Sequence, residues 1–291
     1  MDGPLLLACN HPNSFLDAIL LDILFKKPIW SLARGDVFKN PFYIKLLTKL
    51  KILPVYRTSE GVENLETNYK TFDACKEIFK NNGVVLMFSE GKCINEWHLR
   101  PLMKGTARLA ISTWQEGIDL KVLPVAINYS SFRRFGKNIF LNFGTIINQE
   151  DINVNDTDGR KHIAFNNKLH QELQPLVFEI PSSEKQLQTK LLTVNGGIIS
   201  RILLCIPAFI GFFLHLPFYL PVRIFTKARA NHSDHYDSVL IALLTILYPF
   251  YLLFVTSLLF WITCNRMSLL VLLLLPLTAR AFVQLKGQLD R

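Results

Sequence analysis

An imidazole and a carboxylate lie close together near the start of the chain. His11 and Asp17 belong to the segment LLLACNHPNSFLDAILLDIL (residues 5–24), which is apolar at both ends. A carboxylate that holds one imidazole nitrogen orients the ring and strengthens it as a base, so that it can deprotonate a hydroxyl group attacking a carbonyl. If the chain turns from strand into helix near Asn13 or Ser14, Asp17 falls in the first helical turn and can point back towards His11.

The same residues also allow a purely structural interpretation. Asn10, Asn13 and Ser14 are residue types that cap helices, and His11 would then be a partly exposed loop residue. In either case the N-terminus of a helix favours a nearby anion, such as a phosphate.

The elements that would position these residues alternate along the first 180 residues. Short apolar runs predict strands, and longer amphipathic runs predict helices. The predicted strands are 4–9, 29–33, 52–56, 84–88, 121–129 and 138–147, and the predicted helices are 14–27, 41–51, 64–83, 104–117 and 159–180. Strands and helices that alternate in this way predict an α/β fold, a sheet covered by helices.

Three residues with suitable chemistry directly follow predicted strands. They are His11, Arg57 and Glu90. Because active sites of open α/β sheets gather at the carboxyl ends of strands, we expect these side chains to lie at one edge of the sheet.

Charge points to an anionic partner. The chain has 291 residues and a formal net charge of +9. Between Lys26 and Arg57 there are eight basic residues and one acidic residue, Asp36. Anionic lipid and phosphate esters are the favoured partners, because no helix-turn-helix, zinc finger or RNA-binding aromatic signature accompanies the charge. No nucleic acid is therefore expected.

The last third of the chain has the composition of a membrane segment. Residues 239–262 are 24 residues without a charge. A helix of that length is long enough to cross a hydrocarbon layer of roughly 30 Å. Residues 267–279 are a shorter apolar stretch, joined to the first by a turn at Asn265 and Arg266. Residues 198–221 contain three prolines, an arginine and a histidine, which favours an interfacial or re-entrant segment. We predict a catalytic domain over 1–180, a linker over 181–197 and a membrane-associated helical region over 198–291.

Five cysteines without a CxxC pair suit neither a disulfide framework nor a zinc site. A reduced catalytic domain that faces the cytoplasm is therefore expected, attached to a membrane. No metal site is expected.

The first block of residues resembles the glycerolipid acyltransferase family, whose signature is a His and an Asp a few residues apart after an apolar strand. Three further blocks are similar and follow in the same order. They are GDVFKNPFYIKLLTKLKILPVYR (35–57), LMFSEGK (86–92) followed by KGTARLA (104–110), and VLPVAIN (122–128). The resemblance implies a mixed sheet flanked by helices, with a C-terminal hydrophobic helical membrane segment in this chain.

The sequence departs from the family pattern at two places. Five residues, Pro12 to Leu16, separate His11 from Asp17 where four are usual. Ser89 stands where proline is usual in the third block, and it leaves Glu90 in place.

What the resemblance implies about the reaction centres on one pair. His11 would be the general base that takes the proton from the acceptor hydroxyl, and Asp17 would fix and polarise it. No covalent acyl-enzyme is required. Cys9 is not assigned as a nucleophile, because it alternates into the predicted strand core.

Substrate binding would fall to the later blocks. Arg57 would hold the acceptor phosphate, since a guanidinium offers paired donors to phosphate oxygens. Glu90 and Gly91 would shape the acceptor site, and the glycine lets the backbone approach the ligand. Further phosphate candidates are Lys92, Arg100 and Lys104.

The implied activity is an O-acyltransferase of phospholipid biosynthesis. It would move a fatty acyl group from acyl-CoA or acyl carrier protein, a co-substrate and not a cofactor, to glycerol-3-phosphate or 1-acylglycerol-3-phosphate. Two alternatives stay open. One is a non-catalytic lipid-binding membrane protein that retains the fold, and the other is a lipid esterase or thioesterase. No GxSxG motif is present, which disfavours a serine hydrolase.

Overall fold

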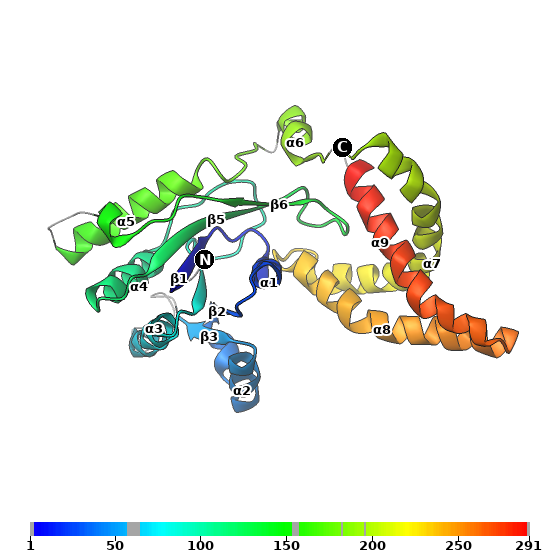
Figure 1. The fold of residues 1–291 in the computed structure, drawn as a ribbon, viewed down its shortest axis with the longest axis horizontal. Coiled ribbons are helices and arrows are strands. Elements are labelled where there is room, and N and C mark those ends of the chain that lie inside the picture. Colours follow the sequence, from blue (N-terminus) through cyan, green and yellow to red (C-terminus); the bar gives the residue numbers. More distant parts are fainter. Residues whose placement is uncertain (1–2, 57–64, 153–156, 182, 195, 290–291) are drawn as a thin grey trace. The chain divides into compact units, whose positions relative to one another are not determined.

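A six-stranded sheet organises the N-terminal part of the chain (Figure 1). The structure is a computed structural model that describes residues 1–291 except 1–2, 57–64, 153–156, 182, 195 and 290–291. The strands are β1 (Leu5–Cys9), β2 (Ile29–Arg34), β3 (Ile52–Val55), β4 (Val84–Phe88), β5 (Lys121–Tyr129) and β6 (Ile139–Phe143). Their order in the sheet is β3-β2-β4-β1-β5-β6.

The parallel pairing brings the ends of three strands to one edge of the sheet. Strand β1 pairs in parallel with β4 and with β5, and Cys9 lies opposite both Phe88 and Val125. Strand β2 pairs in parallel with β4 and β3. All five residues of β1 are buried, as expected for an apolar run at the centre of a parallel sheet. The segments that follow β1 and β4 therefore leave the sheet side by side.

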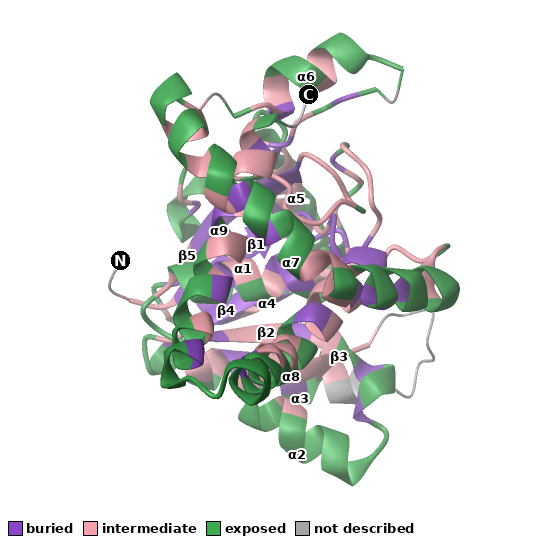
Figure 2. Cartoon of the chain, turned by 90° about the vertical axis from the view of Figure 1, so that its right-hand side faces the viewer, coloured by how far each residue is buried: buried purple, intermediate pink, exposed green. Residues whose placement is uncertain are grey.

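Helices cover this sheet as the periodicity predicts. They are α1 (Ser14–Leu24), α2 (Pro41–Lys49), α3 (Leu65–Lys80), α4 (Lys104–Gln115) and α5 (Asp158–Leu173). Phe79, Trp114 and Phe165 from three of these helices join one buried apolar cluster with residues of β1, β4 and β5. Figure 2 shows β1 and β5 coloured mainly as buried. The predicted α/β class, a mixed sheet flanked by helices, is thus confirmed.

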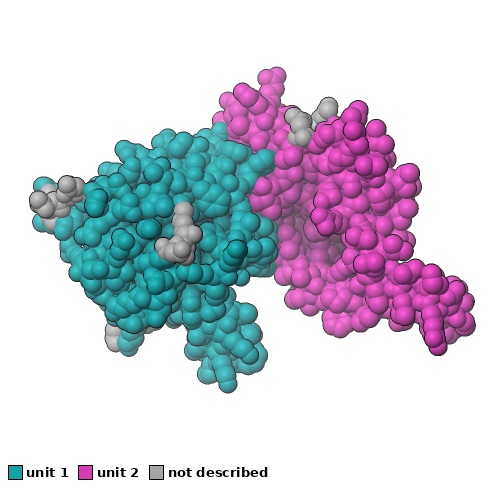
Figure 3. Space-filling view, viewed as in Figure 1, with its two compact units in different colours: residues 1–128, 140–179 teal, residues 129–139, 180–291 magenta. Residues whose placement is uncertain are grey.

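The chain divides into two compact units (Figure 3). Unit 1 consists of residues 1–128 and 140–179, and unit 2 consists of residues 129–139 and 180–291. Helix α6 (Lys185–Leu192) lies within the stretch that the sequence predicts as a linker.

Three long apolar helices make up most of unit 2. They are α7 (Ile198–Ala230), α8 (Tyr236–Thr263) and α9 (Val271–Leu289). Among the described residues, these helices, with α9 counted from Arg266, are long and apolar enough to cross a membrane. Residues 198–221 lie in one helix that continues through Pro207, Pro217 and Pro221, so the expected re-entrant break is absent, and the interfacial placement stays a prediction. The predicted turn between α8 and α9 is present, and the Asn265 side chain accepts a hydrogen bond from the Met267 backbone.

Close packing and satisfied polar groups hold unit 2 together. A Cβ atom at Gly211 of α7 would lie 2.3 Å from the backbone oxygen of Thr278 in α9, so only glycine permits this approach. His215 of α7 contacts the Tyr248 hydroxyl of α8 at 3.2 Å. The 129–139 loop joins these helices, since Lys286 Nζ donates to the Phe135 carbonyl at 2.6 Å.

Candidate active site

The predicted His11–Asp17 pair is present. His11 Nδ1 lies 2.9 Å from Asp17 Oδ2. The Asp17 side chain is fully buried, whereas 17% of the His11 side chain is exposed. A carboxylate accepts hydrogen bonds only, so Asp17 selects the tautomer in which Nδ1 carries the proton. The other nitrogen, Nε2, is then the basic one.

The His11 ring is fixed in place on a second side. It stacks on Phe88, the last residue of β4, with ring centroids 3.8 Å apart and an angle of 10° between the planes. No hydrogen bond of Nε2 occurs among the described residues. A base that is held by stacking and by Asp17, with its second nitrogen available, can take a proton from a bound hydroxyl group.

The turn between β1 and α1 explains how five intervening residues still allow the contact. Asp17 Oδ2 also accepts a hydrogen bond from the Asn13 backbone N–H at 2.8 Å, which fixes the start of the helix. Ser14 has a φ of 53°, in the left-handed region. This turn lies in the segment that carries the additional residue. Asp17 therefore both holds His11 and fixes the helix start, whereas the expected side-chain cap from Asn10 or Asn13 is not formed.

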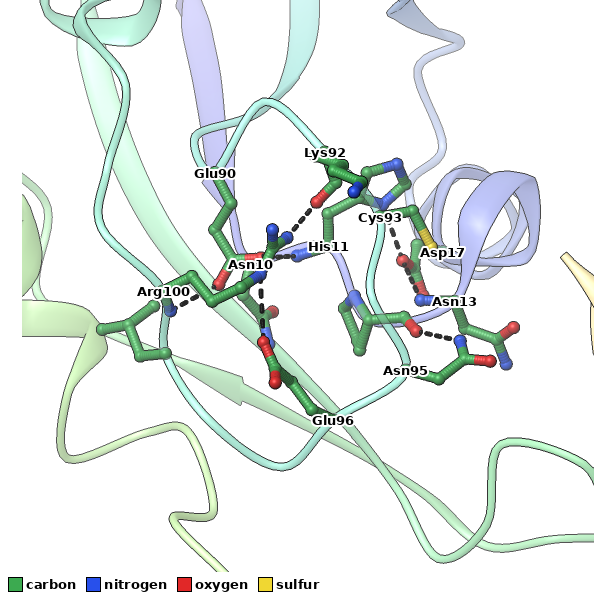
Figure 4. Close-up of polar contacts among 12 residues, drawn as sticks. Asn10, His11, Asn13, Asp17, Glu90, Lys92, Cys93, Asn95, Glu96 and Arg100 are labelled. Atoms are coloured by element: carbon green, nitrogen blue, oxygen red, sulfur yellow. Dashed lines mark hydrogen bonds and ion pairs between the residues drawn. The ribbon is translucent and has the colours of Figure 1, made fainter. Parts of the chain in front are cut away.

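The Glu90 carboxylate holds the backbone of the segment that carries His11 (Figure 4). Its Oε2 accepts from the His11 backbone N–H at 3.0 Å and from Arg100 Nη2 at 2.8 Å. Its Oε1 accepts from the Arg100 backbone N–H at 3.0 Å. Only 3% of Glu90 is exposed. Glu90 therefore positions the His11 backbone. Both of its carboxylate oxygens accept hydrogen bonds from protein donors.

Residues next to Glu90 have distinct backbone roles. Gly91 has a φ of 67°, a conformation that favours glycine. The Ser89 backbone N–H donates to the Cys9 carbonyl at 2.8 Å, and its hydroxyl accepts from Thr106 at 3.0 Å. A proline at position 89 has no N–H and could not make the first bond. Serine at position 89 thus keeps a backbone N–H that bonds the end of β4 to the end of β1.

The loop after β4 makes further contacts with the His11 segment. The Ile94 backbone N–H donates to the His11 carbonyl at 3.2 Å, and the Asn95 side chain donates to the Pro12 carbonyl at 2.7 Å. The Ser14 backbone N–H donates to Cys93 Sγ at 2.9 Å. This loop, together with Glu90, encloses the segment on which His11 sits.

Asn10 anchors the same segment to the sheet. Its side chain accepts from the Ile127 backbone N–H at 2.8 Å and donates to the Ile127 carbonyl at 3.1 Å. Asn10 is therefore bonded to β5 and does not cap the helix. Burial, together with the nearby Asp17 charge, raises the pKa of the Cys9 thiol well above its usual value. This disfavours a thiolate at Cys9, in agreement with its exclusion as a nucleophile.

The structure places the phosphate candidates as follows. Lys92 and Lys104 are exposed, after β4 and at the first residue of α4 respectively. Arg100 is engaged by Glu90, by Glu96 Oε1 at 3.3 Å and by the Lys92 carbonyl. Arg57 lies outside the described residues. The roles of Arg57, Lys92 and Lys104 in substrate binding stay predictions.

Sequence reasoning missed the positioning residues. It gave Asn10 a capping role and considered Arg100 only as a phosphate ligand, and it assigned nothing to Asn95. One local signal pointed to Arg100. It lies shortly after the third block, and it follows an acidic residue, Glu96, by four positions. No local pattern marked the contact between Asn10 and Ile127.

Comparisons with known proteins bear on the N-terminal part of the chain. Residues 1–128 match the family model described as Acyltransferase. A search of the curated proteins gives no match. Among solved structures, the chain is similar to the crystal structure of the 1-acyl-sn-glycerophosphate (LPA) acyltransferase PlsC from Thermotoga maritima. That similarity has 15% sequence identity and a TM-score of 0.43, and covers 62% of this chain and 68% of the other.

Proposed function

We propose that this chain, whose residues 1–128 match the family model described as Acyltransferase, transfers a fatty acyl group to a glycerol-phosphate acceptor at a membrane. The acceptor is glycerol-3-phosphate or 1-acylglycerol-3-phosphate, and the donor is a thioester, acyl-CoA or acyl carrier protein. The observation that carries the proposal is the His11–Asp17 pair at the carboxyl edge of the sheet, in which no described residue bonds to Nε2 and this nitrogen can take a hydroxyl proton.

The chemistry follows from the arrangement of that pair. As the acceptor oxygen attacks the thioester carbonyl, Nε2 of His11 takes the hydroxyl proton, and Asp17 stabilises the imidazolium that forms. Collapse of the tetrahedral intermediate breaks the carbon–sulfur bond. The imidazolium then returns its proton to the leaving thiolate, which leaves the free thiol and the new ester. The chain needs no acyl-enzyme intermediate.

An apolar surface next to the site supports a long acyl substrate. Helix α1 begins three residues after His11, and it exposes Phe15, Ile19 and Ile23 at four-residue spacing. Residues at this spacing lie in one row along a helix. A row of exposed apolar side chains that starts beside the base suits contact with a hydrocarbon chain.

The basic surface of unit 1 supports a phosphorylated acceptor and an anionic donor. Lys92 and Lys104 are exposed on segments that follow β4, the strand whose end stacks on His11. Cationic groups near the base would hold phosphate oxygens while the hydroxyl is deprotonated.

The test is acyl transfer by the purified full chain in detergent or vesicles, with a radiolabelled acyl thioester and each acceptor in turn. Lipid products are separated from free fatty acid. We expect acylated acceptor from the wild type and a loss of about 10²- to 10⁴-fold in His11→Ala, the usual contribution of a general base. Equal activity of the two proteins would refute the mechanism. Free fatty acid without acylated acceptor would indicate an esterase or thioesterase.

We also infer that unit 1 faces the cytoplasm. Among the described residues, all five cysteines are free thiols, as a reducing compartment requires. An engineered Glu116→Cys, on an exposed residue of unit 1 in a chain with Cys205→Ser and Cys264→Ser, should react with a membrane-impermeant maleimide in inside-out vesicles and not in intact cells. Labelling in intact cells would place unit 1 on the opposite side.

A further inference from the structure

Helix α2 is amphipathic, with most of its apolar residues on one side and Ile44 on the other. Phe42, Leu46 and Leu50 follow one another at four-residue spacing, and Tyr43 lies beside that row. Lys45 and Lys49 are also four residues apart and border that row on the side away from Tyr43, because successive residues are turned by about 100°. This pattern predicts a helix that buries its apolar side against the core.

The structure leaves that apolar side uncovered. No residue of α2 is buried (Figure 2). The exposed fractions are 69% for Phe42, 52% for Tyr43, 42% for Leu46 and 60% for Leu50. Soluble monomeric proteins rarely expose a contiguous apolar patch of this kind unless it meets a partner or a membrane.

Charge identifies the partner. Lys39, Lys45 and Lys49 are exposed, and none of them forms an ion pair among the described residues. No acidic residue occurs between Val37 and Tyr56. An exposed apolar stripe flanked by unpaired lysines is the composition of a helix that lies in the interface of an anionic bilayer. A second copy of α2 is a poor alternative, because it would bring lysines towards lysines.

We propose that α2 lies flat in the headgroup region of a bilayer that contains anionic phospholipid, with Phe42, Leu46 and Leu50 inserted among the acyl chains. Tyr43 suits the boundary of that layer, since its ring is apolar and its hydroxyl is polar. This contact would be a membrane attachment of unit 1 itself, separate from the three apolar helices of unit 2. The proposal does not depend on acyl transfer.

The experiment uses the full chain in which the exposed cysteines are replaced, Cys205→Ser and Cys264→Ser. A single cysteine is then introduced at Leu46 on the apolar side, or at Thr48 on the polar side as a matched control. Each is labelled with the environment-sensitive fluorophore NBD. The labelled proteins are reconstituted into vesicles of phosphatidylcholine alone or of phosphatidylcholine mixed with phosphatidylglycerol.

We expect the probe at position 46 to shift its emission to the blue in the anionic vesicles and to be quenched by spin-labelled lipid. The probe at position 48 should stay water-like. Lys45→Gln with Lys49→Gln should reduce the ratio of inserted to free helix by about 25-fold, since each lysine near an anionic surface contributes about fivefold. High salt should act in the same direction.

Two results would overturn the proposal. One is a water-like probe at position 46 in anionic vesicles. The other is a probe that is shielded there but insensitive to spin-labelled lipid, which would mean that protein covers α2. Acyl transfer is measured on the same samples. An inactive protein whose α2 inserts would refute the proposed function alone, and an active protein whose α2 stays in water would refute this inference alone.

Discussion

Replacing Asp17 by asparagine tests the role of its charge, because asparagine has nearly the same shape. In the structure Asp17 Oδ2 accepts two hydrogen bonds, from His11 Nδ1 at 2.9 Å and from the Asn13 backbone at 2.8 Å. One amide oxygen can accept both, so Asp17→Asn removes the negative charge and keeps the contacts. A hydrogen bond to a charged group contributes about 1.5–3 kcal/mol and a neutral one about 0.5–1.5 kcal/mol.

The magnitude follows from when the charge is needed. The His11 ring becomes a cation only as Nε2 takes the proton, so the carboxylate stabilises the transition state more than the resting enzyme. The difference between the charged and the neutral hydrogen bond, about 1–1.5 kcal/mol, corresponds to roughly 5- to 13-fold in kcat. Asp17→Ala should lose more, and it should also unfold at a lower temperature. The buried Asn13 N–H would then lack its acceptor, at a cost of about 1–3 kcal/mol.

The assay is the initial rate of acyl transfer at saturating acceptor, together with thermal unfolding of each variant. The double variant His11→Ala, Asp17→Asn should be no slower than His11→Ala alone, because Asp17 acts through His11. The reasoning is refuted if Asp17→Asn keeps the wild-type kcat while remaining folded. In that case Asp17 would serve only to start helix α1.

Three further outcomes follow from the contacts around this pair. Arg100→Met should lower the free energy of unfolding by about 2 kcal/mol or more and reduce kcat. The reason is that the buried Glu90 carboxylate loses one hydrogen-bond donor. An unchanged denaturant midpoint of unfolding would contradict this. Ser89→Pro should destabilise the fold by about 1–3 kcal/mol, since the Cys9 carbonyl loses its donor. Ser89→Ala keeps that N–H and should destabilise the fold less. Urea unfolding compares the two variants. Burial raises the pKa of Cys75 to about 12, so iodoacetamide at neutral pH should modify it only after unfolding, as peptide mass spectrometry can report.

Local patterns predicted the elements of unit 1 closely. The apolar runs 84–88 and 121–129 are strands with those bounds, and the helix expected at 104–117 spans Lys104–Gln115. The helix ends are less well predicted, as in the helix expected at 14–27, which ends at Leu24. Periodicity reports which residues face a core, whereas the last turn of a helix depends on what it packs against.

The sequence by itself determined the strands, the helices and the His11–Asp17 pair, because all of these depend on neighbours within a few residues along the chain. Only the tertiary structure decided that Glu90 and Arg100 hold the His11 backbone, that Asn10 bonds to β5, and that α2 leaves its apolar side outside the core. Those contacts depend on which strands become neighbours and on how much core remains for each helix to cover. A local pattern is the same whether its apolar side meets the sheet or remains exposed, so only the folded chain could distinguish the two.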